Sequence, residues 1–372
     1  MTTAEPRPIG LYLHVPFCKA KCLYCDFYSM PAGEETKDAY TSALCRAIDE
    51  ADPLCDTVYF GGGTPSQLGT ARLTALLSHI RRTPDCEVTL ECNPGDADSL
   101  DFRALAAAGV NRISMGLQSA NDAERRALGR RSDAATVRRA VALARAAGIT
   151  NLSLDLMLGI PGQTAESLAK SIDFCLALEV PHISAYLLKI EDGTPFAAMR
   201  DRLALPDEDT VCDDYLQTVE ALTAADLRQY EISNFARPGF ESRHNLKYWR
   251  CEPYLGLGPA AHSFLDGRRF YYPRDLQAFL DGRPPIPDGA GGDPAEWLML
   301  RLRLMEGVTD AAFAARFGRP LPAAFRQSAE RFARQGLMTV TDGAAALTPA
   351  GCLLSNPIIG ALTESAAEID TN

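Results

Sequence analysis

The sequence lacks the long hydrophobic runs that mark membrane and secreted proteins. Its 372 residues contain no run of about 18 apolar residues, the length at which a membrane-spanning helix would be expected. The first residues also hold no apolar segment of the signal-peptide type. We therefore expect a cytoplasmic location with no transmembrane segment, which leaves peripheral contact with a membrane surface open.

Basic charge is also scarce. The chain has 37 Lys and Arg against 48 Asp and Glu, a net charge of −11. This negative charge disfavours non-specific electrostatic binding of nucleic acid by the chain as a whole. Residues 296–372 hold seven Arg, no Lys and eight acidic residues, whereas a DNA-reading module should be basic on one face. We expect no nucleic-acid partner.

Cysteine is abundant, and its number argues against a disulfide framework. The 11 cysteines are an odd number, spread over a long chain without a secretion signal, so most should be reduced thiols. A local group of them points to metal binding rather than to disulfides. With 47% hydrophobic residues, the chain can build a large core and a second, smaller unit.

The first 190 residues alternate between strand-like and helix-like segments. Such an alternation predicts a parallel sheet with right-handed helical crossovers, either an open doubly wound sheet or a barrel-like arc. The expected helices include residues 70–82, 99–108, 134–147 and 165–178, and the expected strands are 11–15, 57–60, 87–91, 112–118, 152–158 and 182–188.

Polar or glycine-rich residues follow each of these expected strands. Ligands of parallel α/β folds gather at the carboxyl ends of the strands, so these residues predict one composite site. In strand order, the segments are Cys18-x3-Cys22-x2-Cys25, Gly61-Gly62-Gly63-Thr64-Pro65, Glu91-Cys92-Asn93-Pro94, Gln118-Ser119, Asp155 with Gly159-Ile160-Pro161-Gly162, and Lys189.

The three early cysteines are the most specific of these signals. Thiolates suit iron–sulfur clusters and zinc, and the spacing lets a tight loop wrap one cluster. Three ligands for a four-iron cluster leave one iron free for a small chelating molecule. Two alternatives stay open at this point: a zinc site completed by His14, and unrelated buried cysteines.

Single polar residues gain meaning from their strand positions. Asp155 shares an alternating face with Asn151 and Ser153, while leucines occupy the opposite face, so polar groups should point inward. Glu91 and Gln118 suit ribose hydroxyls or an ammonium group as acceptors, and Arg130 suits a carboxylate. Taken alone, each would more often be a solvated or capping residue.

The segments CKAKCLYCDF, GGGTP, ECNP, GLQS and DLMLGIPGQT resemble the radical S-adenosylmethionine (SAM) superfamily. The branch they are most similar to is that of oxygen-independent coproporphyrinogen III oxidase, and the likeness extends to LTPAGCLLSN in the tail. The resemblance implies an α/β fold, a partial (β/α)6 barrel followed by a small helical, winged-helix-like domain. It also implies a [4Fe–4S] cluster on Cys18, Cys22 and Cys25, with SAM chelating the open iron. The residues at SAM-binding positions would be Tyr12, Tyr24, Gly62, Gly63, Thr64, Glu91, Gln118, Arg130 and Asp155.

The chain departs from the oxidase pattern at one position. The oxidases continue the motif with a fourth cysteine, where this chain has Phe27, which puts coproporphyrinogen decarboxylation in doubt. The CDF ending and the segment HNLKYW instead resemble the heme chaperones of this branch. That resemblance implies that His244 binds heme, since imidazole is a common axial ligand. His262 and His182 are candidates for a second ligand.

The predicted function is therefore that of a heme chaperone, which binds heme and transfers it to an acceptor protein whose identity the sequence does not give. Its cofactors would be the [4Fe–4S] cluster, SAM and heme. The alternatives are a radical SAM enzyme that acts on a porphyrinogen, and a zinc-binding interaction protein. We expect residues 1–235 to form the barrel and 236–280 to carry the heme motif and close it. Residues 281–295, with four prolines and four glycines, should be a linker, and residues 296–372 the C-terminal domain, with a strand–turn–strand and a helix start at 336–351.

Overall fold

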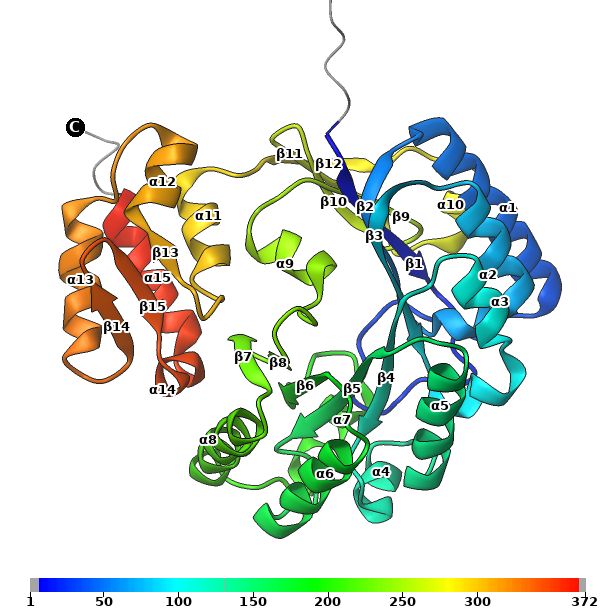
Figure 1. Cartoon of the computed structure of the whole chain (residues 1–372), viewed down its shortest axis with the longest axis horizontal. Helices are drawn as coiled ribbons and strands as arrows, with labels where there is room; N and C mark the ends of the chain where they lie inside the picture. Colours follow the sequence, from blue (N-terminus) through cyan, green and yellow to red (C-terminus); the bar gives the residue numbers. More distant parts are fainter. Residues whose placement is uncertain (1–6, 131, 368–372) are drawn as a thin grey trace, which may run out of the picture.

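The computed structural model describes residues 7–130 and 132–367. Six parallel strands form the centre of a curved sheet, and helices cover its outer, convex side (Figure 1). The six strands are β1 (Ile9–Val15), β2 (Leu54–Gly62), β3 (Arg81–Cys92), β4 (Arg112–Gln118), β5 (Asn151–Leu158) and β6 (His182–Leu187). The crossover helices are α1 (Glu34–Ala51), α2 (Gly69–Ser78), α3 (Phe102–Ala107), α4 (Asp122–Ala127), α5 (Ala134–Ala146) and α6 (Ala165–Ala177), with short 3-10 turns η1 (Pro65–Leu68) and η2 (Pro94–Ser99).

Further strands extend both edges of this sheet. The strand order is β12-β11-β10-β9-β1-β2-β3-β4-β5-β6-β8-β7, so β12 and β7 stand at opposite ends and the sheet is an open arc. β9 pairs with β1 in parallel, and the added strands beyond β9 and β6 are antiparallel. The added elements are α7 (Pro195–Ala198), η3 (Arg200–Arg202), α8 (Glu208–Ala224), β7 (Arg228–Glu231), β8 (Asn234–Ala236), α9 (Arg243–Trp249), β9 (Tyr254–Leu257), β10 (His262–Leu265), β11 (Arg268–Tyr271), α10 (Leu276–Leu280) and β12 (Ile286–Ala290).

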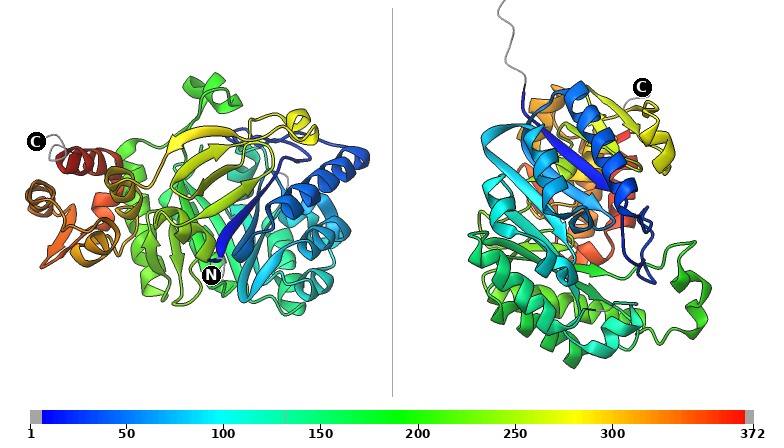
Figure 2. Two further views of the ribbon diagram at one scale, coloured as in Figure 1. Left: turned by 90° about the horizontal axis from the view of Figure 1, so that it is seen from above. Right: turned by 90° about the vertical axis from the view of Figure 1, so that its right-hand side faces the viewer.

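The tail forms a separate small unit beside the arc (Figure 2). Its three short strands pair in the order β13-β15-β14, and helices pack around them, with α15 against α11 and α13. The expected strand–turn–strand and helix start are present at β14, β15 and α14. The elements are α11 (Pro294–Arg301), β13 (Val308–Thr309), α12 (Asp310–Phe317), α13 (Ala323–Ala333), β14 (Met338–Thr341), β15 (Ala344–Leu347), α14 (Pro349–Leu353) and α15 (Ser355–Ala367).

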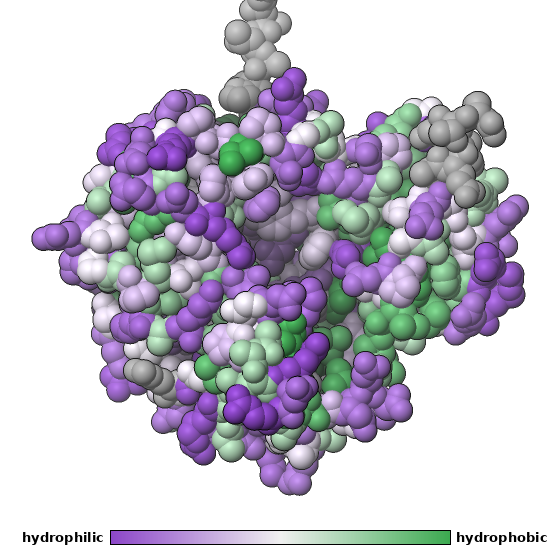
Figure 3. All heavy atoms as spheres, turned by 180° about the vertical axis from the view of Figure 1, so that it is seen from behind, coloured by the Kyte–Doolittle hydropathy of each residue, from purple (hydrophilic) through white to green (hydrophobic). Residues whose placement is uncertain are grey.

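The alternation of the strands decides which side is core and which is cavity. In β4, Ile113, Met115 and Leu117 are buried beneath the helices, whereas Ser114 and Gly116 of the opposite face line a cavity. The space-filling view from behind shows a hollow near the middle of the molecule, lined by pale and purple side chains rather than green ones (Figure 3). The expected α/β arc is confirmed. No helix in the described part of the chain is long and apolar enough to cross a membrane.

Two sequence expectations differ from the structure. The helix expected at 70–82 ends at Ser78, and Arg81 and Arg82 already belong to β3. Within residues 281–295, where a linker is expected, β12 pairs with β11.

Candidate functional site

The three predicted cluster cysteines lie on the loop that joins β1 to α1. Backbone hydrogen bonds close this loop on itself: the Cys18 amide donates to the Met30 carbonyl (3.0 Å), and the Met30 amide donates to the Pro16 carbonyl (2.9 Å). The Cys25 amide donates to the Cys22 carbonyl (3.2 Å), a tight turn that draws these two thiols together. All three cysteines are half-buried free thiols and line one cavity.

The glycine run at the end of β2 lies directly against this loop. The Gly63 amide donates to the Val15 carbonyl (2.8 Å) and the Thr64 amide to the Phe17 carbonyl (2.8 Å). A Cβ on Gly63 would lie 2.9 Å from both carbonyl oxygens, which are backbone atoms and cannot move aside. Glycine is therefore needed for this close approach. It brings the Thr64 hydroxyl within 3.2 Å of the Cys18 Sγ.

One cavity of about 390 Å³ gathers most of the predicted site. The cysteine loop forms one wall, and the carboxyl ends of β2 to β6 form the other. The predicted residues that line it are Cys18, Cys22, Tyr24, Cys25, Gly62, Gly63, Thr64, Glu91, Gln118, Arg130 and Asp155.

Arg130 is the main cationic group of this cavity. Its guanidinium donates to the Tyr24 hydroxyl (3.1 Å), and its Nε is buried without a hydrogen-bond partner. Among the described residues Arg130 forms no ion pair. A half-buried guanidinium that forms no ion pair is only partly stabilised, so this group is suited to an anionic ligand.

Two half-buried carboxyl groups, those of Glu91 and Asp155, line the same cavity. Burial raises the pKa of Glu91 to about 7, although the Tyr59 hydroxyl that donates to it (2.8 Å) opposes the shift. Burial also raises the pKa of Asp155, against hydrogen bonds from Ser184 and Ser114. Both groups can accept hydrogen bonds from a ligand's hydroxyl or ammonium groups.

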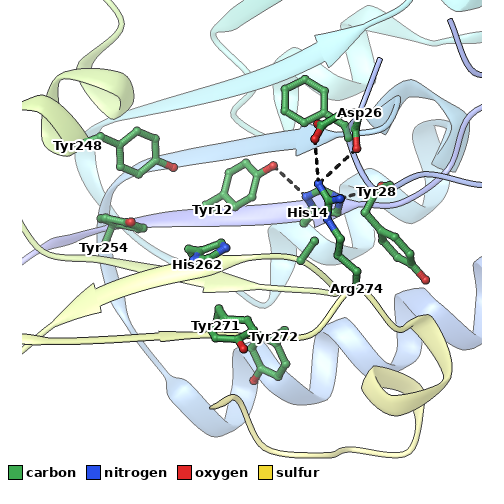
Figure 4. A pocket seen from close by; sticks show the side chains of 12 residues that line it. Tyr12, His14, Asp26, Tyr28, Tyr248, Tyr254, His262, Tyr271, Tyr272 and Arg274 are labelled. Atoms are coloured by element: carbon green, nitrogen blue, oxygen red, sulfur yellow. Dashed lines mark hydrogen bonds and ion pairs between the residues drawn. The ribbon is translucent and has the colours of Figure 1, made fainter. Parts of the chain in front are cut away.

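Two of the predicted residues lie outside this cavity. Tyr12 lines a second cavity, which is walled largely by tyrosines (Figure 4), and its hydroxyl lies 3.1 Å from His14 Nδ1. His244 is completely buried on α9. Its Nδ1 lies 2.8 Å from the Thr57 hydroxyl, and its Nε2 lies 2.7 Å from the Tyr248 hydroxyl.

The two histidines named as second-ligand candidates differ sharply. His182 is buried, with Nδ1 2.7 Å from the Ser153 hydroxyl and Nε2 2.9 Å from the Tyr230 hydroxyl. His262 is exposed at the start of β10 and lines the second cavity.

The chemistry of the donor set fits a cluster with a chelating ligand. Three thiols line a cavity that also holds an unpaired guanidinium and two carboxyl groups. Within residues 7–130 and 132–367, no three His, Cys, Asp or Glu side chains converge closely enough to hold a single metal ion. His14, the residue considered for a zinc site, has its Nε2 3.0 Å from the Tyr28 carbonyl and its Nδ1 beside Tyr12.

Sequence reasoning missed several residues of the cavity. Tyr186 lines it, and Ser114 and Ser184 hold Asp155. The signal was available, because Ser114 alternates with Gly116 and Gln118 on the inward face of β4, as Ser184 does with Tyr186 on β6. Phe27 lines both cavities and is 61% exposed.

Comparisons with known proteins agree with this geometry. The Radical SAM superfamily profile matches residues 12–175, and the HemN C-terminal domain profile matches residues 293–354. The chain is 36% identical to "Heme chaperone HemW" of Mycobacterium tuberculosis, over 96% of this chain and 95% of that protein. It is 38% identical to the Escherichia coli protein of the same name, over 84% of this chain and 86% of that protein.

A solved structure shows the same fold. Coproporphyrinogen III oxidase (HemN) from Escherichia coli, a radical SAM enzyme, superposes with a TM-score of 0.81 at 22% identity. The match covers 96% of this chain and 90% of the oxidase. The partial barrel with its small C-terminal domain, expected from the sequence, is thus confirmed.

Proposed function

The chain belongs to the radical SAM superfamily and, within it, to the HemW family, and from this premise we propose that it is a heme chaperone. It would bind heme and transfer it to an acceptor protein. The observation that carries the proposal is the extent of the relationship, which includes the cysteine loop, the barrel and the tail rather than a cofactor motif alone. The cytoplasmic location stays a prediction.

We further propose how the cofactors are held. Cys18, Cys22 and Cys25 would ligate three irons of a [4Fe–4S] cluster, and the remaining iron would accept the amino and carboxylate groups of SAM. Arg130 would pair with a carboxylate of the bound molecule, because its half-buried guanidinium forms no ion pair with the described acidic residues, although Asp155 attracts it. Gly62, Gly63 and Thr64 would let the ligand approach the backbone, while Glu91, Gln118 and Asp155 would accept its hydrogen bonds. When bound, the cluster and SAM supply one-electron chemistry.

Tyr24 and Tyr12 would act at different distances from SAM. The Tyr24 hydroxyl accepts a hydrogen bond from Arg130, so it would orient the guanidinium toward the ligand. Tyr12 lies behind the cavity and contacts His14 instead. A direct contact between Tyr12 and SAM would require the side chain to turn, and it stays a prediction from the resemblance.

If His244 ligates heme, its present hydrogen bonds must first be broken. Both ring nitrogens are hydrogen-bonded, and burial lowers the pKa of the imidazole to about 3. The ring is therefore neutral, as a metal ligand must be. However, Nε2 would have to leave Tyr248, and α9 would have to open, before iron could reach it.

The proposal is tested with anaerobically purified, cluster-loaded protein. Hemin is titrated and the Soret band recorded, and an apo-hemoprotein is then added as acceptor. A chaperone should bind about one hemin per chain and deliver it at a rate that rises with acceptor concentration. Failure to bind hemin would contradict the proposal, and so would a delivery rate fixed by spontaneous hemin release.

The alternative is catalysis on a porphyrinogen, as in the oxidase that shares this fold. Phe27 argues against it, because this exposed side chain stands where the oxidase motif has a further cysteine. Protein with cluster, SAM, dithionite and coproporphyrinogen III should release no carbon dioxide above a reaction without protein. Release of carbon dioxide over many turnovers would instead show that the protein is a coproporphyrinogen-decarboxylating enzyme.

A further inference from the structure

One buried carboxylate accepts hydrogen bonds from two of the segments that form the cysteine cavity. Asp96 lies in η2, directly after β3, and its side chain is 4% exposed. Its Oδ1 accepts a hydrogen bond from Lys19 Nζ (2.6 Å) in the cysteine loop. Its Oδ2 accepts from the Ser66 hydroxyl (2.8 Å) and from the Gln67 side-chain amide (2.5 Å), both in η1 after the glycine run.

This carboxylate does not serve its own helical turn. The N-cap of η2 is Asn93, whose side-chain oxygen accepts a hydrogen bond from the Gly95 amide (3.0 Å). All three side-chain donors to Asp96 therefore belong to other elements. A buried carboxylate costs free energy unless it is hydrogen-bonded, so its position is explained by the segments that it joins.

Two of these contacts lead to the same predicted cluster ligand, Cys18. The first runs through Lys19, which directly follows Cys18 in the chain. The second runs through Gln67, whose backbone amide donates to the Thr64 carbonyl (2.9 Å). The Thr64 hydroxyl in turn lies 3.2 Å from the Cys18 Sγ. Asp96 thus reaches Cys18 along two separate paths.

Ser66 connects the same carboxylate to the end of β3. Its hydroxyl donates to Asp96 and accepts a hydrogen bond from the Asn93 amide (3.2 Å). Asn93 follows Glu91 in the chain, and both residues line the cysteine cavity. The cysteine loop, the turn after β2 and the end of β3 are therefore joined at one side chain.

The partners of Asp96 differ in exposure, and this difference shows what its loss would change. The Lys19 side chain is 71% exposed, so its ammonium would return to water at little cost. Ser66 is buried, and it would lose its acceptor inside the protein. Hydrogen bonds to a charged acceptor are stronger than those between neutral groups, so an uncharged residue at position 96 would hold these segments more weakly.

We propose that Asp96 is a positioning residue of the cluster site, whose carboxylate holds Cys18 and Thr64 in place through Lys19 and Gln67. The inference rests on the proposed function, because it presupposes that the three cysteines hold a cluster. Asp96 does not line the cysteine cavity, so it would act through its neighbours and not as a ligand.

The test measures how fast full-length protein, reconstituted anaerobically, loses its cluster absorbance to an iron chelator. Asp96→Asn keeps the side-chain shape but places an NH₂ group among three donors. We expect it to lose the cluster about 10- to 100-fold faster, the scale on which altered outer contacts weaken metal sites. Lys19→Met should lose it about 2- to 5-fold faster, because this lysine is exposed.

Two further measurements distinguish positioning from a general effect on folding. The double variant of Asp96→Asn and Lys19→Met should lose the cluster no faster than Asp96→Asn alone, because both changes remove the same ion pair. The electron paramagnetic resonance spectrum of the reduced cluster should also change in Asp96→Asn, since the surroundings of one ligand are altered. A purely structural role would leave that spectrum as in the wild type.

Two control variants accompany these measurements. Asp101→Ala removes the N-cap of α3, where the carboxylate accepts hydrogen bonds from the Arg103 and Ala104 amides (3.0 Å each). It should lower the urea midpoint and leave the rate of cluster loss unchanged. Lys170→Met removes a lysine that is 70% exposed from a 2.7 Å ion pair on α6, a close match to Lys19, and should behave as the wild type.

The possible outcomes separate this inference from the proposed function. A wild-type rate in Asp96→Asn overturns the inference. Equal acceleration in Asp96→Asn and Asp101→Ala also overturns it, because Asp96 would then act through overall stability. If Asp96→Asn does not fold, a wild-type rate in Lys19→Met contradicts the inference and a faster rate supports it. If the wild type itself takes up no cluster, the cofactor arrangement of the proposed function fails instead.

Discussion

Cys18, Cys22 and Cys25 differ from the other thiols of the chain in their surroundings. They are half-buried and line one cavity. Cys55 and Cys92 are instead buried, which raises the pKa of each thiol to about 12, so these two thiols stay protonated and inert. Burial also raises the pKa of Cys25. The spacing of the three cysteines was readable from the sequence because it is local.

Replacement of any of the three cysteines should abolish the cluster. After anaerobic reconstitution, Cys18→Ser, Cys22→Ser and Cys25→Ser should each hold little iron and sulfide, since two remaining thiolates bind a cubane poorly. Iron and sulfide assays with the visible charge-transfer absorbance measure this. Cys45→Ser, on the outer helix α1, is the matched control and should load fully. Full loading of the three variants would refute the assignment, and zinc in place of iron would favour the zinc-binding alternative.

Glu91 provides a pH test of the cavity without cofactors. Burial raises the pKa of its carboxyl from 4.5 to about 7, so between these values the folded state holds a proton that the unfolded state has lost. The stabilisation from this proton is complete below pH 4.5 and is lost as the pH rises through 7. Glu91→Gln, which is always neutral, should therefore gain stability over the wild type as pH rises.

Urea unfolding of the apo chain at several pH values measures this difference. The gain should grow by about 1.4 kcal/mol per pH unit inside the window and level off above it. Glu166→Gln, at an exposed carboxyl on α6, should show no such growth. A constant difference across the window would mean that Glu91 is ionised in the folded protein.

Tyr12 and His244 show the limit of residue-level prediction. The family motif places both, but only the packing of β1 against β2 and α9 decides where their rings point. Tyr12 lies against His14, and His244 stacks on Tyr59 with ring centroids 5.2 Å apart. A motif records which residue is present and not which contacts occupy it.

At the scale of elements, the burial of each strand's faces explains which strands could be predicted from the sequence. The six central strands were predicted because one face packs beneath helices and the other carries polar or small residues toward the cavity, which gives a readable alternation. β12 was hidden in a segment rich in proline and glycine, because all five of its residues are exposed. An exposed edge strand has no buried face and tolerates Pro287, so it leaves no periodic signal.

The helix that ends early has a similar explanation. Residues 70–82 continue a helical pattern, but β3 begins at Arg81 and pairs with Leu54 and Cys55 of β2. The paired residues are far apart in the sequence, so the local helix propensity of residues 70–82 does not predict this pairing. The C-terminal hairpin was predicted because Asp342-Gly343 is a strong local turn signal between two short strands.

Polar contacts hold helix α9 against the sheet, and the contribution of one of them to stability can be measured. The His244 side chain bonds Thr57 of β2, its amide donates to Glu87 (3.1 Å), and Lys247 pairs with Asp56 (2.8 Å). Thr57→Val keeps the side-chain shape but leaves His244 Nδ1 without a partner in a buried site. We expect a loss of about 1–3 kcal/mol in unfolding free energy.

Denaturant unfolding should be compared with Thr74→Val on α2, a half-buried position whose hydroxyl makes only an exposed hydrogen bond to the Ala71 carbonyl. That control has the same change of side chain and should cost well below 1 kcal/mol, on the order of 0.5 kcal/mol or less. Equal costs for the two variants would show that the Thr57 contact does not hold α9.

At the scale of the whole molecule, α9 connects the barrel to the tail. His244 faces the sheet, while Trp249 at the other end lies under Arg303, whose guanidinium carbon is 5.8 Å from the ring centroid. The Met305 amide also donates to the Tyr230 carbonyl (3.0 Å), and Arg250 pairs with Glu306 (3.4 Å). The polar contacts of the barrel and the packing of the tail thus meet around one short helix, which the sequence could not show because the two parts are far apart in the chain.

This connection predicts that a change in the tail loosens α9. Arg303→Ala removes the cation above Trp249 together with a hydrogen bond to Asn356 (3.1 Å). A cation–π contact of about 0.5–1 kcal/mol corresponds to roughly 2- to 5-fold faster amide hydrogen exchange in α9, while exchange in β4 should not change. Arg326→Ala, which breaks a pair with Asp310 within the tail, should leave α9 unaffected. If both variants speed exchange in α9 equally, the tail acts through its overall stability, and if neither does, α9 is held by the sheet alone.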